Sequence, residues 1–238
     1  PRSHGGPGGR DRVTAPDIRA RRIGREGLPV AVIDGFAPDP DALVAFARGQ
    51  GFEPARNHYP GVRAPLPTDY LQTQAGVLAL VLREVFGAGG AAARVLDACF
   101  AIVATPRSAL SPEQRRPHID ALDDDRIALV HYLSPGATEG TAFFRHRATE
   151  FETIDPSRGP HYMATLDAEL RGGQPSPSGY ICDDTDLFER THGVEGRFNR
   201  AVIYRSNMLH SGAITAQTPL SADPAIGRLT ITGFLALS

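Results

Sequence analysis

Apolar positions in the first third of the chain follow a mixed pattern of one strand and two helices. A compact apolar run at residues 28–34 predicts a strand. A helix is predicted over 39–49, with one of two aspartates near its start as the N-cap. A second helix is predicted over 69–86, where apolar residues recur at three- and four-residue intervals until Gly87.

From residue 94 onward the pattern becomes typical of strands. Compact apolar runs, separated by proline and glycine turns, predict strands at 95–104, 127–133, 141–144, 202–204 and 229–237. Short strands at this spacing predict a mainly β fold with flanking helices (α+β), built as an antiparallel barrel or jelly roll.

Three segments depart from these patterns. Residues 1–27 are rich in glycine and arginine, and we expect a flexible N-terminal tail, native or partly vector-derived. The proline-rich stretch 52–67 predicts an irregular loop. Residues 146–197 mix turns with a helical piece near 161–171, and predict a long insertion that covers a binding site. The remainder, 28–238, is expected to form a single domain.

Composition excludes several classes of function. The net charge of −2 and the lack of long charge runs argue against a nucleic-acid partner. All 25 basic residues are arginine, so neither a Schiff-base lysine nor a P-loop lysine is available. Two cysteines exclude a disulfide framework, and no apolar run reaches membrane-spanning length. A cytoplasmic protein without a membrane partner is the expectation.

The strongest chemical signal is His118-Ile119-Asp120. On a strand, residues i and i+2 leave the same face, so this imidazole and this carboxylate can bind one divalent metal. One further histidine would complete the 2-His-1-carboxylate triad, which leaves open positions on an iron(II).

Of the eight histidines, the seven other than His118 are candidates for the third ligand, and His210 is the best placed. It follows a predicted strand and turn and begins the next strand, with Ser211 and Gly212 after it. In a jelly roll, opposed strands come from distant parts of the chain, so His210 can meet His118. His131 lies inside a predicted strand, where a core or pocket role is the simpler interpretation.

Arg228 is an isolated cation at the head of an otherwise apolar predicted strand. A buried arginine needs an anionic partner, because an unpaired buried charge is very costly. The distal carboxylate of a dicarboxylate cosubstrate would supply one, and Thr230, two residues on and on the same face, could share it.

His118-x-Asp120, His210 and Arg228-x-Thr230 together resemble the iron(II)/2-oxoglutarate-dependent dioxygenases. The runs 199–212 and 228–234 are similar to the prolyl-4-hydroxylase-like branch of this superfamily. Residues 32–36 and 59–65 resemble a bacterial family of unassigned function within that superfamily. The resemblance covers about residues 28–145 and 198–237.

This resemblance implies a double-stranded β-helix (a cupin-like jelly roll) that uses iron(II), 2-oxoglutarate and O2. It implies His118, Asp120 and His210 as the metal ligands and catalytic centre, with Arg228 and Thr230 binding 2-oxoglutarate. It also implies hydroxylation, or a related oxidation, of an unactivated C–H bond, with release of succinate and CO2.

Further residues are expected around this centre. His131 and Tyr132 alternate across one strand, so one faces inward, and either could touch the cosubstrate. Arg63, Gly61 and Arg116 are predicted to bind the substrate. The expected substrate is a small molecule: an amino acid, an amino-acid derivative or a biosynthetic natural-product intermediate.

Two alternatives stay open. The chain could be a non-enzymatic jelly-roll binding module, which separated ligands or a solvent-exposed Arg228 would support. It could also be a cupin-like metal dioxygenase that does not use 2-oxoglutarate. The sequence does not distinguish a monomer from a homodimer.

Overall fold

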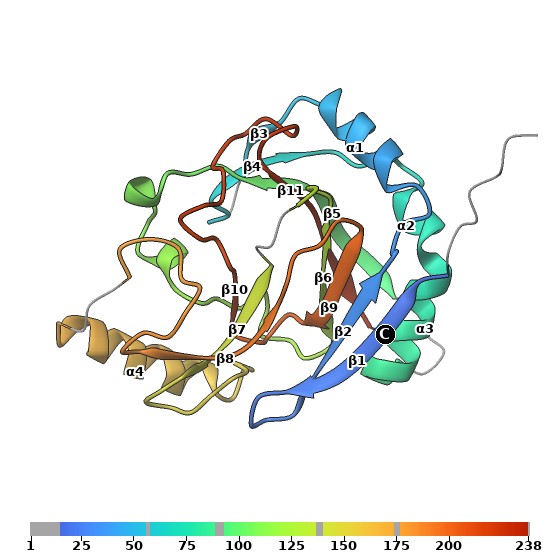
Figure 1. Ribbon diagram of the computed structural model, residues 1–238. Helices are drawn as coiled ribbons and strands as arrows, with labels where there is room; N and C mark the ends of the chain where they lie inside the picture. Colours follow the sequence, from blue (N-terminus) through green and yellow to red (C-terminus); the bar gives the residue numbers. More distant parts are fainter. Residues whose placement is uncertain (1–14, 56–57, 89–92, 137–139, 174–176, 238) are drawn as a thin grey trace, which may run out of the picture.

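A computed structural model describes residues 15–55, 58–88, 93–136, 140–173 and 177–237. Two antiparallel sheets form its centre (Figure 1). The major sheet has the strand order β1-β2-β9-β6-β11-β5-β4-β3, and the minor sheet has the order β10-β7-β8. Strands distant in sequence are neighbours in both sheets, as in a double-stranded β-helix, so the predicted mainly β jelly roll with flanking helices is confirmed.

The strands of the major sheet are β1 (Asp17–Ile23), β2 (Leu28–Asp34), β3 (Glu53–Pro54), β4 (Gly61–Ala64), β5 (Arg94–Val103), β6 (Arg126–Tyr132), β9 (Arg200–Arg205) and β11 (Arg228–Ala236). Those of the minor sheet are β7 (Thr141–His146), β8 (Phe188–Val194) and β10 (His210–Gly212). The helices are α1 (Pro40–Arg48), α2 (Tyr70–Thr73), α3 (Ala75–Phe86) and α4 (Gly159–Arg171), with 3-10 turns η1 (Arg107–Ala109) and η2 (Glu113–Arg115).

Both predicted helical regions form where expected. Asp39 caps α1 by accepting a hydrogen bond from Ala42 N at 2.9 Å. The second region is divided at Gln74 into α2 and α3, and Gly87 ends α3 in the left-handed conformation.

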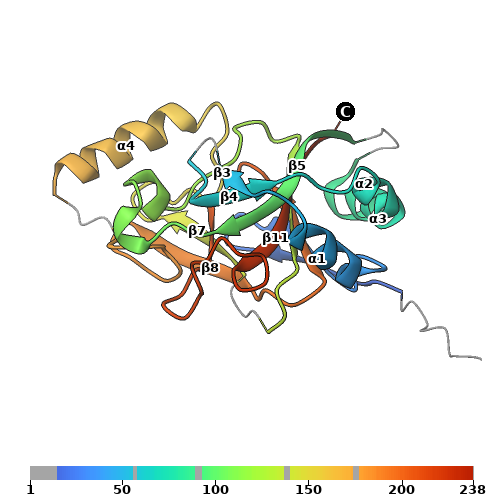
Figure 2. The same cartoon turned by 90° about the horizontal axis from the view of Figure 1, so that it is seen from above.

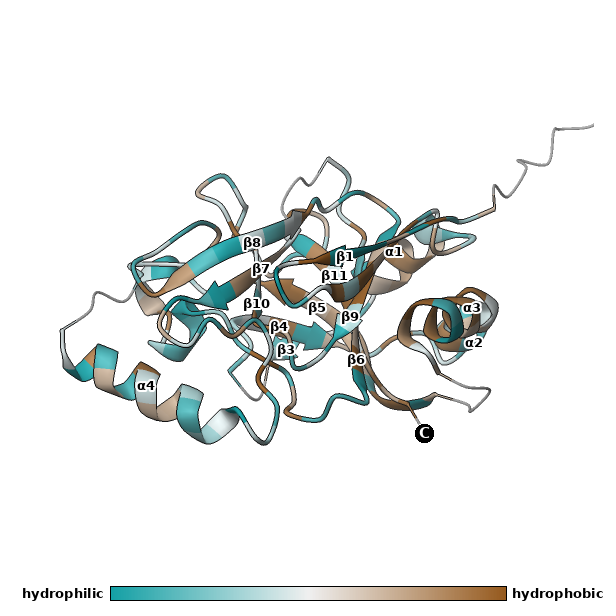
Figure 3. Ribbon diagram, turned by 90° about the horizontal axis from the view of Figure 1, so that it is seen from below, coloured by the Kyte–Doolittle hydropathy of each residue, from teal (hydrophilic) through white to brown (hydrophobic). Residues whose placement is uncertain are grey.

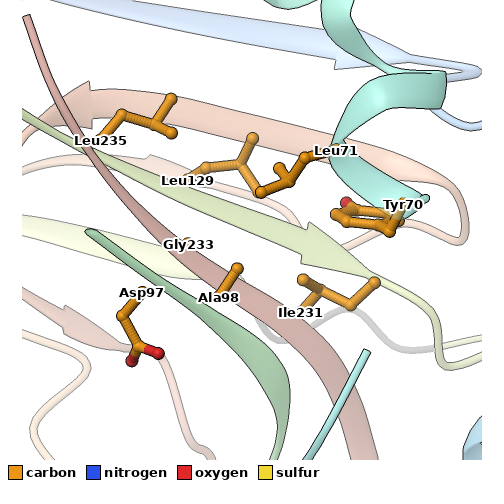
Figure 4. Close-up of a pocket in the computed structure, with 8 residues that line it drawn as sticks. All are labelled: Tyr70, Leu71, Asp97, Ala98, Leu129, Ile231, Gly233 and Leu235. Carbon is orange, nitrogen blue, oxygen red and sulfur yellow. The ribbon is translucent and has the colours of Figure 1, made fainter. Parts of the chain in front are cut away.

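Helices α1, α2 and α3 cover the outer face of the major sheet, whereas α4 lies on the far side of the minor sheet (Figure 2). Figure 3 shows the hydrophobic colour gathered where the strands meet α1–α3, and mixed colouring along α4. Leu129, Ile231 and Leu235 point from the sheet toward Tyr70 and Leu71 of α2 (Figure 4). Successive residues of a strand point to opposite faces of the sheet. The side chains of β6 and β11 that do not face the helices therefore face the space between the two sheets.

The predicted tail boundary at residue 27 is wrong. Residues 1–14 lie outside the described part of the chain, but Asp17–Ile23 form the edge strand β1, paired along its whole length with β2. Its side chains are mostly exposed and charged, which protects the edge of the sheet from pairing with another chain. The charged residues also remove the apolar alternation by which a strand is predicted from sequence.

The turn between β1 and β2 is held by a buried carboxylate. Glu152, 2% exposed, accepts hydrogen bonds from Arg25 N at 2.9 Å and Glu26 N at 3.1 Å. It also pairs with Arg145 at 3.3 Å.

Two further predicted boundaries also change. The stretch 52–67 contains β3 and β4, which extend the major sheet beyond β5. The predicted insertion ends before residue 188, because β8 pairs with β7 in the minor sheet. The helical piece predicted near 161–171 within this insertion is α4. None of the helices in the described ranges combines the length and the apolar character that crossing a bilayer requires.

Candidate metal centre

A cavity of about 620 Å³ lies between the two sheets. Its walls come from β4, β5, β6 and β11 of the major sheet, from β10 of the minor sheet and from the segment around His118. Tyr180 and Ile181 also line it, so the segment between β7 and β8 contributes to the wall. The volume is within the range of small-molecule sites.

His118, Asp120 and His210 meet at this cavity. One potential ligand atom from each lies within 4.8 Å of the other two. His118 Nε2 is 3.8 Å from Asp120 Oδ1, and His210 Nε2 is 3.4 Å from Asp120 Oδ2. Two imidazole nitrogens and one carboxylate therefore converge, as the sequence predicts.

Backbone hydrogen bonds bring these residues together. His118 N donates to His210 O and His210 N donates to His118 O, both at 2.9 Å, so the two residues form an isolated antiparallel bridge. Asp120 N donates to Ser206 O at 2.8 Å. The segment around His118 therefore extends the minor sheet next to β10 without being a full strand.

The ring of His210 is oriented by a second contact. Its Nδ1 lies 2.8 Å from the Met208 carbonyl oxygen, which can only accept, so Nδ1 carries the proton. Nε2 keeps its lone pair and faces Asp120. Metal-bound histidines are held by such an outer hydrogen bond.

The electrostatics of the three groups suit a divalent cation. The surrounding protein atoms lower the pKa of His118 to about 4, although 54% of its side chain is open to the cavity. His210 strengthens this effect and Asp120 opposes it. Burial lowers the pKa of His210 to about 4 as well, opposed by the hydrogen bond to Met208. Burial raises the pKa of Asp120, against the effects of His118 and Arg63. Neutral imidazoles are the form that binds a metal, and a cation would compensate the desolvated carboxylate.

Arg228 lines the same cavity and is only 6% exposed. Its Nη2 donates to Gly140 O at 2.9 Å, and its guanidinium carbon is 5.3 Å from the centroid of the Tyr132 ring. Thr230 follows on the same face and donates to Ala101 O at 3.0 Å. The structure thus brings Arg228 and Thr230 to the cavity wall and places Tyr132 behind Arg228.

His131 is not brought to the cavity. It is fully buried on the opposite face of β6, with Nδ1 3.0 Å from the Tyr70 hydroxyl and Nε2 3.0 Å from Asn199 Oδ1. Strand alternation allows only one of His131 and Tyr132 to face inward, and Tyr132 has that orientation. The expected cosubstrate contact of His131 is corrected accordingly.

The three predicted substrate residues differ in position. Arg63 and Arg116 both line the cavity. Arg116 is held by Pro112 O at 3.1 Å and by Glu113 at 3.7 Å. Gly61 is not among the lining residues; a Cβ there would overlap the carbonyl oxygen of Ile102 on β5, so glycine allows the close approach of two strands.

Sequence reasoning did not single out Tyr59, Asp97 and Tyr204, which also line the cavity. Burial raises the pKa of Tyr59 to about 12, against the charges of Arg228 and Arg63. The ring centroid of Tyr204 is 4.8 Å from that of His210. Period-two alternation identifies Tyr204 as inward-facing once the register of β9 is known.

The fold and the site together define a class: a double-stranded β-helix protein with a candidate His-Asp-His metal triad in its central cavity. The chain belongs to a family of unknown function, DUF6445, whose sequence pattern matches residues 14–235. A comparison with curated proteins found no match.

The chain is similar to several solved structures. One is HygX from Streptomyces hygroscopicus with nickel and 2-oxoglutarate bound, at 12% identity, covering 88% of this chain and 83% of HygX, with a TM-score of 0.46. Another is the non-heme α-ketoglutarate-dependent epimerase SnoN from nogalamycin biosynthesis, at 14% identity, 90% and 79% coverage and a TM-score of 0.46. A third is the Kdo hydroxylase KdoO in complex with α-ketoglutarate and Fe(III), at 13% identity, 74% and 66% coverage and a TM-score of 0.36.

Proposed function

We propose that this protein is an iron(II)- and 2-oxoglutarate-dependent oxygenase that oxidises an unactivated C–H bond of a small molecule. The observation that carries the proposal is the convergence of His118, Asp120 and His210 within 4.8 Å, on a cavity that also contains Arg228. Two histidines and one carboxylate form the ligand set typical of iron(II) oxygenases.

Each residue has a distinct role in this proposal. His118, Asp120 and His210 would hold the iron. Arg228 would bind the distal carboxylate of 2-oxoglutarate through charge-assisted hydrogen bonds. Thr230 would join it by turning its hydroxyl hydrogen from Ala101 O to the carboxylate. When bound, iron(II) and 2-oxoglutarate supply the oxidation of a C–H bond by O2, with release of succinate and CO2.

The protein contributes positioning and shielding. Tyr132 packs against Arg228, and its hydroxyl lies 2.7 Å from Thr141 Oγ1, so both partners are fixed within the wall. Apolar side chains such as Val103, Ile181 and Phe234 line the rest of the cavity and limit the entry of water.

The alternative of a binding module without a metal is disfavoured by the same observations. Separated ligands or an exposed Arg228 would have supported it, whereas the ligand atoms converge and Arg228 is 6% exposed. A cupin-like dioxygenase that needs no 2-oxoglutarate offers no role for an arginine at position 228, and cofactor dependence separates the two.

The first test is an anaerobic titration of the metal-free protein with iron(II) and then with 2-oxoglutarate, followed by visible absorbance. Bidentate chelation of iron(II) by a keto acid gives a weak charge-transfer band. We expect the band in the wild type, its loss in His210→Ala, and at least about tenfold weaker 2-oxoglutarate binding in Arg228→Gln. His161→Ala, an exposed histidine on α4, is the matched control.

The outcomes separate the candidates. Iron binding without the band would favour a cupin-like dioxygenase, and no iron binding would favour a binding module. An unchanged titration in His210→Ala would contradict the triad.

A further inference from the structure

Arg63 and Asp97 form a pair of opposite charges on the cavity wall. Arg63 lies on β4 and Asp97 on the neighbouring strand β5, and Arg63 Nη1 is 3.5 Å from Asp97 Oδ2. The register pairs Arg63 with Ala101 and Ala101 with Thr230, so Arg63 shares the inner face of the sheet with Thr230. Figure 4 shows Asp97 pointing away from Tyr70, which packs on the outer face.

This pair has unused hydrogen-bonding capacity. Arg63 Nε is buried and has no hydrogen-bond partner within the described ranges. The contact with Asp97 is an ion pair only, and the Asp97 side chain remains 55% exposed. By contrast, the buried Arg200 donates from Nε at 2.6 Å and from Nη2 at 2.8 Å to Asp34. A buried donor without a partner is costly and indicates a group that arrives with a ligand.

The guanidinium of Arg63 is nevertheless held in place. Its carbon atom lies 4.9 Å from the centroid of the Tyr59 ring, a cation–π contact that restrains the guanidinium. An oriented guanidinium binds a carboxylate through two parallel hydrogen bonds. Tyr59 lines the same cavity as Arg228 and Thr230, so Arg63 is positioned by the same wall that carries the proposed 2-oxoglutarate site.

We propose that Arg63 and Asp97 bind the zwitterionic head group of an α-amino acid, with its carboxylate on Arg63 and its ammonium on Asp97. This proposal rests on the proposed function, which assigns Arg228 to 2-oxoglutarate and leaves Arg63 for the substrate. A zwitterion presents both charges across a single carbon atom, which matches a cation and an anion 3.5 Å apart. A simple anion would be repelled by Asp97, and a ligand without an acceptor atom would leave Arg63 Nε without a hydrogen-bond partner.

The test measures binding to protein loaded with zinc(II), a diamagnetic metal, and 2-oxoglutarate, by ligand-observed NMR with the proteinogenic L-amino acids as probes. For each amino acid that binds, its methyl ester removes the carboxylate charge and its N-acetyl derivative removes the ammonium. We expect both derivatives to bind wild type at least about tenfold more weakly than the parent amino acid.

Two substitutions test which of the two residues binds which charged group of the amino acid. Arg63→Gln should weaken the amino acid at least about tenfold and abolish its advantage over the ester, because the carboxylate has lost its partner. Asp97→Asn should abolish the advantage over the N-acetyl derivative. Arg94→Gln, an exposed arginine on the same strand as Asp97, should behave as wild type.

Several results would overturn this inference. They are the absence of binding by any amino acid, equal binding of the derivatives to wild type, or 2-oxoglutarate binding that is lost in Arg63→Gln but kept in Arg228→Gln. The proposed function is tested separately, before any amino acid is added. It fails if the wild type shows no metal-dependent binding of 2-oxoglutarate.

Discussion

His131 is a buried histidine with both ring nitrogens in hydrogen bonds. The Asn199 side-chain oxygen only accepts, so Nε2 carries the proton and Nδ1 accepts from the Tyr70 hydroxyl. The ring is therefore a neutral structural element that joins β6 to α2. Burial lowers its pKa from the ordinary 6.5 to about 4, against the effect of Asn199.

This lowered pKa makes the stability of the fold depend on pH. Below about pH 6.5 the unfolded chain protonates His131, whereas the folded protein does so only near pH 4, so stability is lost as the pH falls through this window. The loss reaches at most about 3 kcal/mol. His131→Gln should flatten the pH dependence between pH 7 and 5, measured by urea unfolding. Equal pH dependence in both proteins would contradict the prediction.

At the scale of elements, Gly61 explains why β4 pairs so closely with β5. Replacing Gly61 by alanine would force Cβ against the Ile102 carbonyl oxygen and move the strands apart. We expect Gly61→Ala to lower the free energy of unfolding by about 2–3 kcal/mol. Gly51→Ala is the control, because no atom lies within 4 Å of its added Cβ. If Gly61→Ala is as stable as wild type in urea unfolding, the requirement for glycine at this strand pairing is contradicted.

The β1–β2 hairpin depends on Glu152, which accepts from two backbone amides of its turn and pairs with Arg145. Glu152→Ala should destabilise the protein by about 3–5 kcal/mol, because it leaves those amides without a partner and Arg145 with only Glu189 among the described residues. Urea unfolding measures the loss, and faster amide exchange at Arg25 and Glu26 locates it.

The control for this variant is Glu150→Ala, whose ion pair with Arg25 is exposed on both sides. Exposed pairs contribute little, so we expect a change within about 0.5 kcal/mol. Similar effects of the two substitutions would show that burial of Glu152 is not what stabilises the turn.

At the scale of the molecule, the candidate site lies between two sheets, so ligands that bind it also stabilise the fold. Manganese(II) together with 2-oxoglutarate should raise the melting temperature, with a gain of about 3 kcal/mol when the free ligand is near 100 times its Kd. A chelator should reverse the rise, and His210→Ala should show none. An identical melting temperature with and without metal and 2-oxoglutarate would contradict metal binding at this site.

Two groups of polar side chains, the candidate triad and the Arg63–Asp97 pair, differ in whether the sequence predicts them. The convergence of His118, Asp120 and His210 was predictable, because His118-x-Asp120, His210 and Arg228-x-Thr230 in this order resemble a known family. The pairing of Arg63 with Asp97 was not, because it depends on β4 lying beside β5, and β4 is a four-residue strand in a proline-rich stretch. The same holds for β1, whose charged side chains conceal a strand.

The sequence by itself determined the mainly β class and the helices before it, because periodicity and capping act over a few neighbouring positions. It also indicated the candidate triad residues, because their motifs resemble those of a known family. Only the tertiary structure decided that Tyr132 packs behind Arg228 on the inner face of the sheet and that His131 contacts the helices. It also decided that Gly61 serves strand pairing and that Arg63 meets Asp97. Those outcomes depend on register between distant strands, and a shift of one residue would move each side chain to the other face.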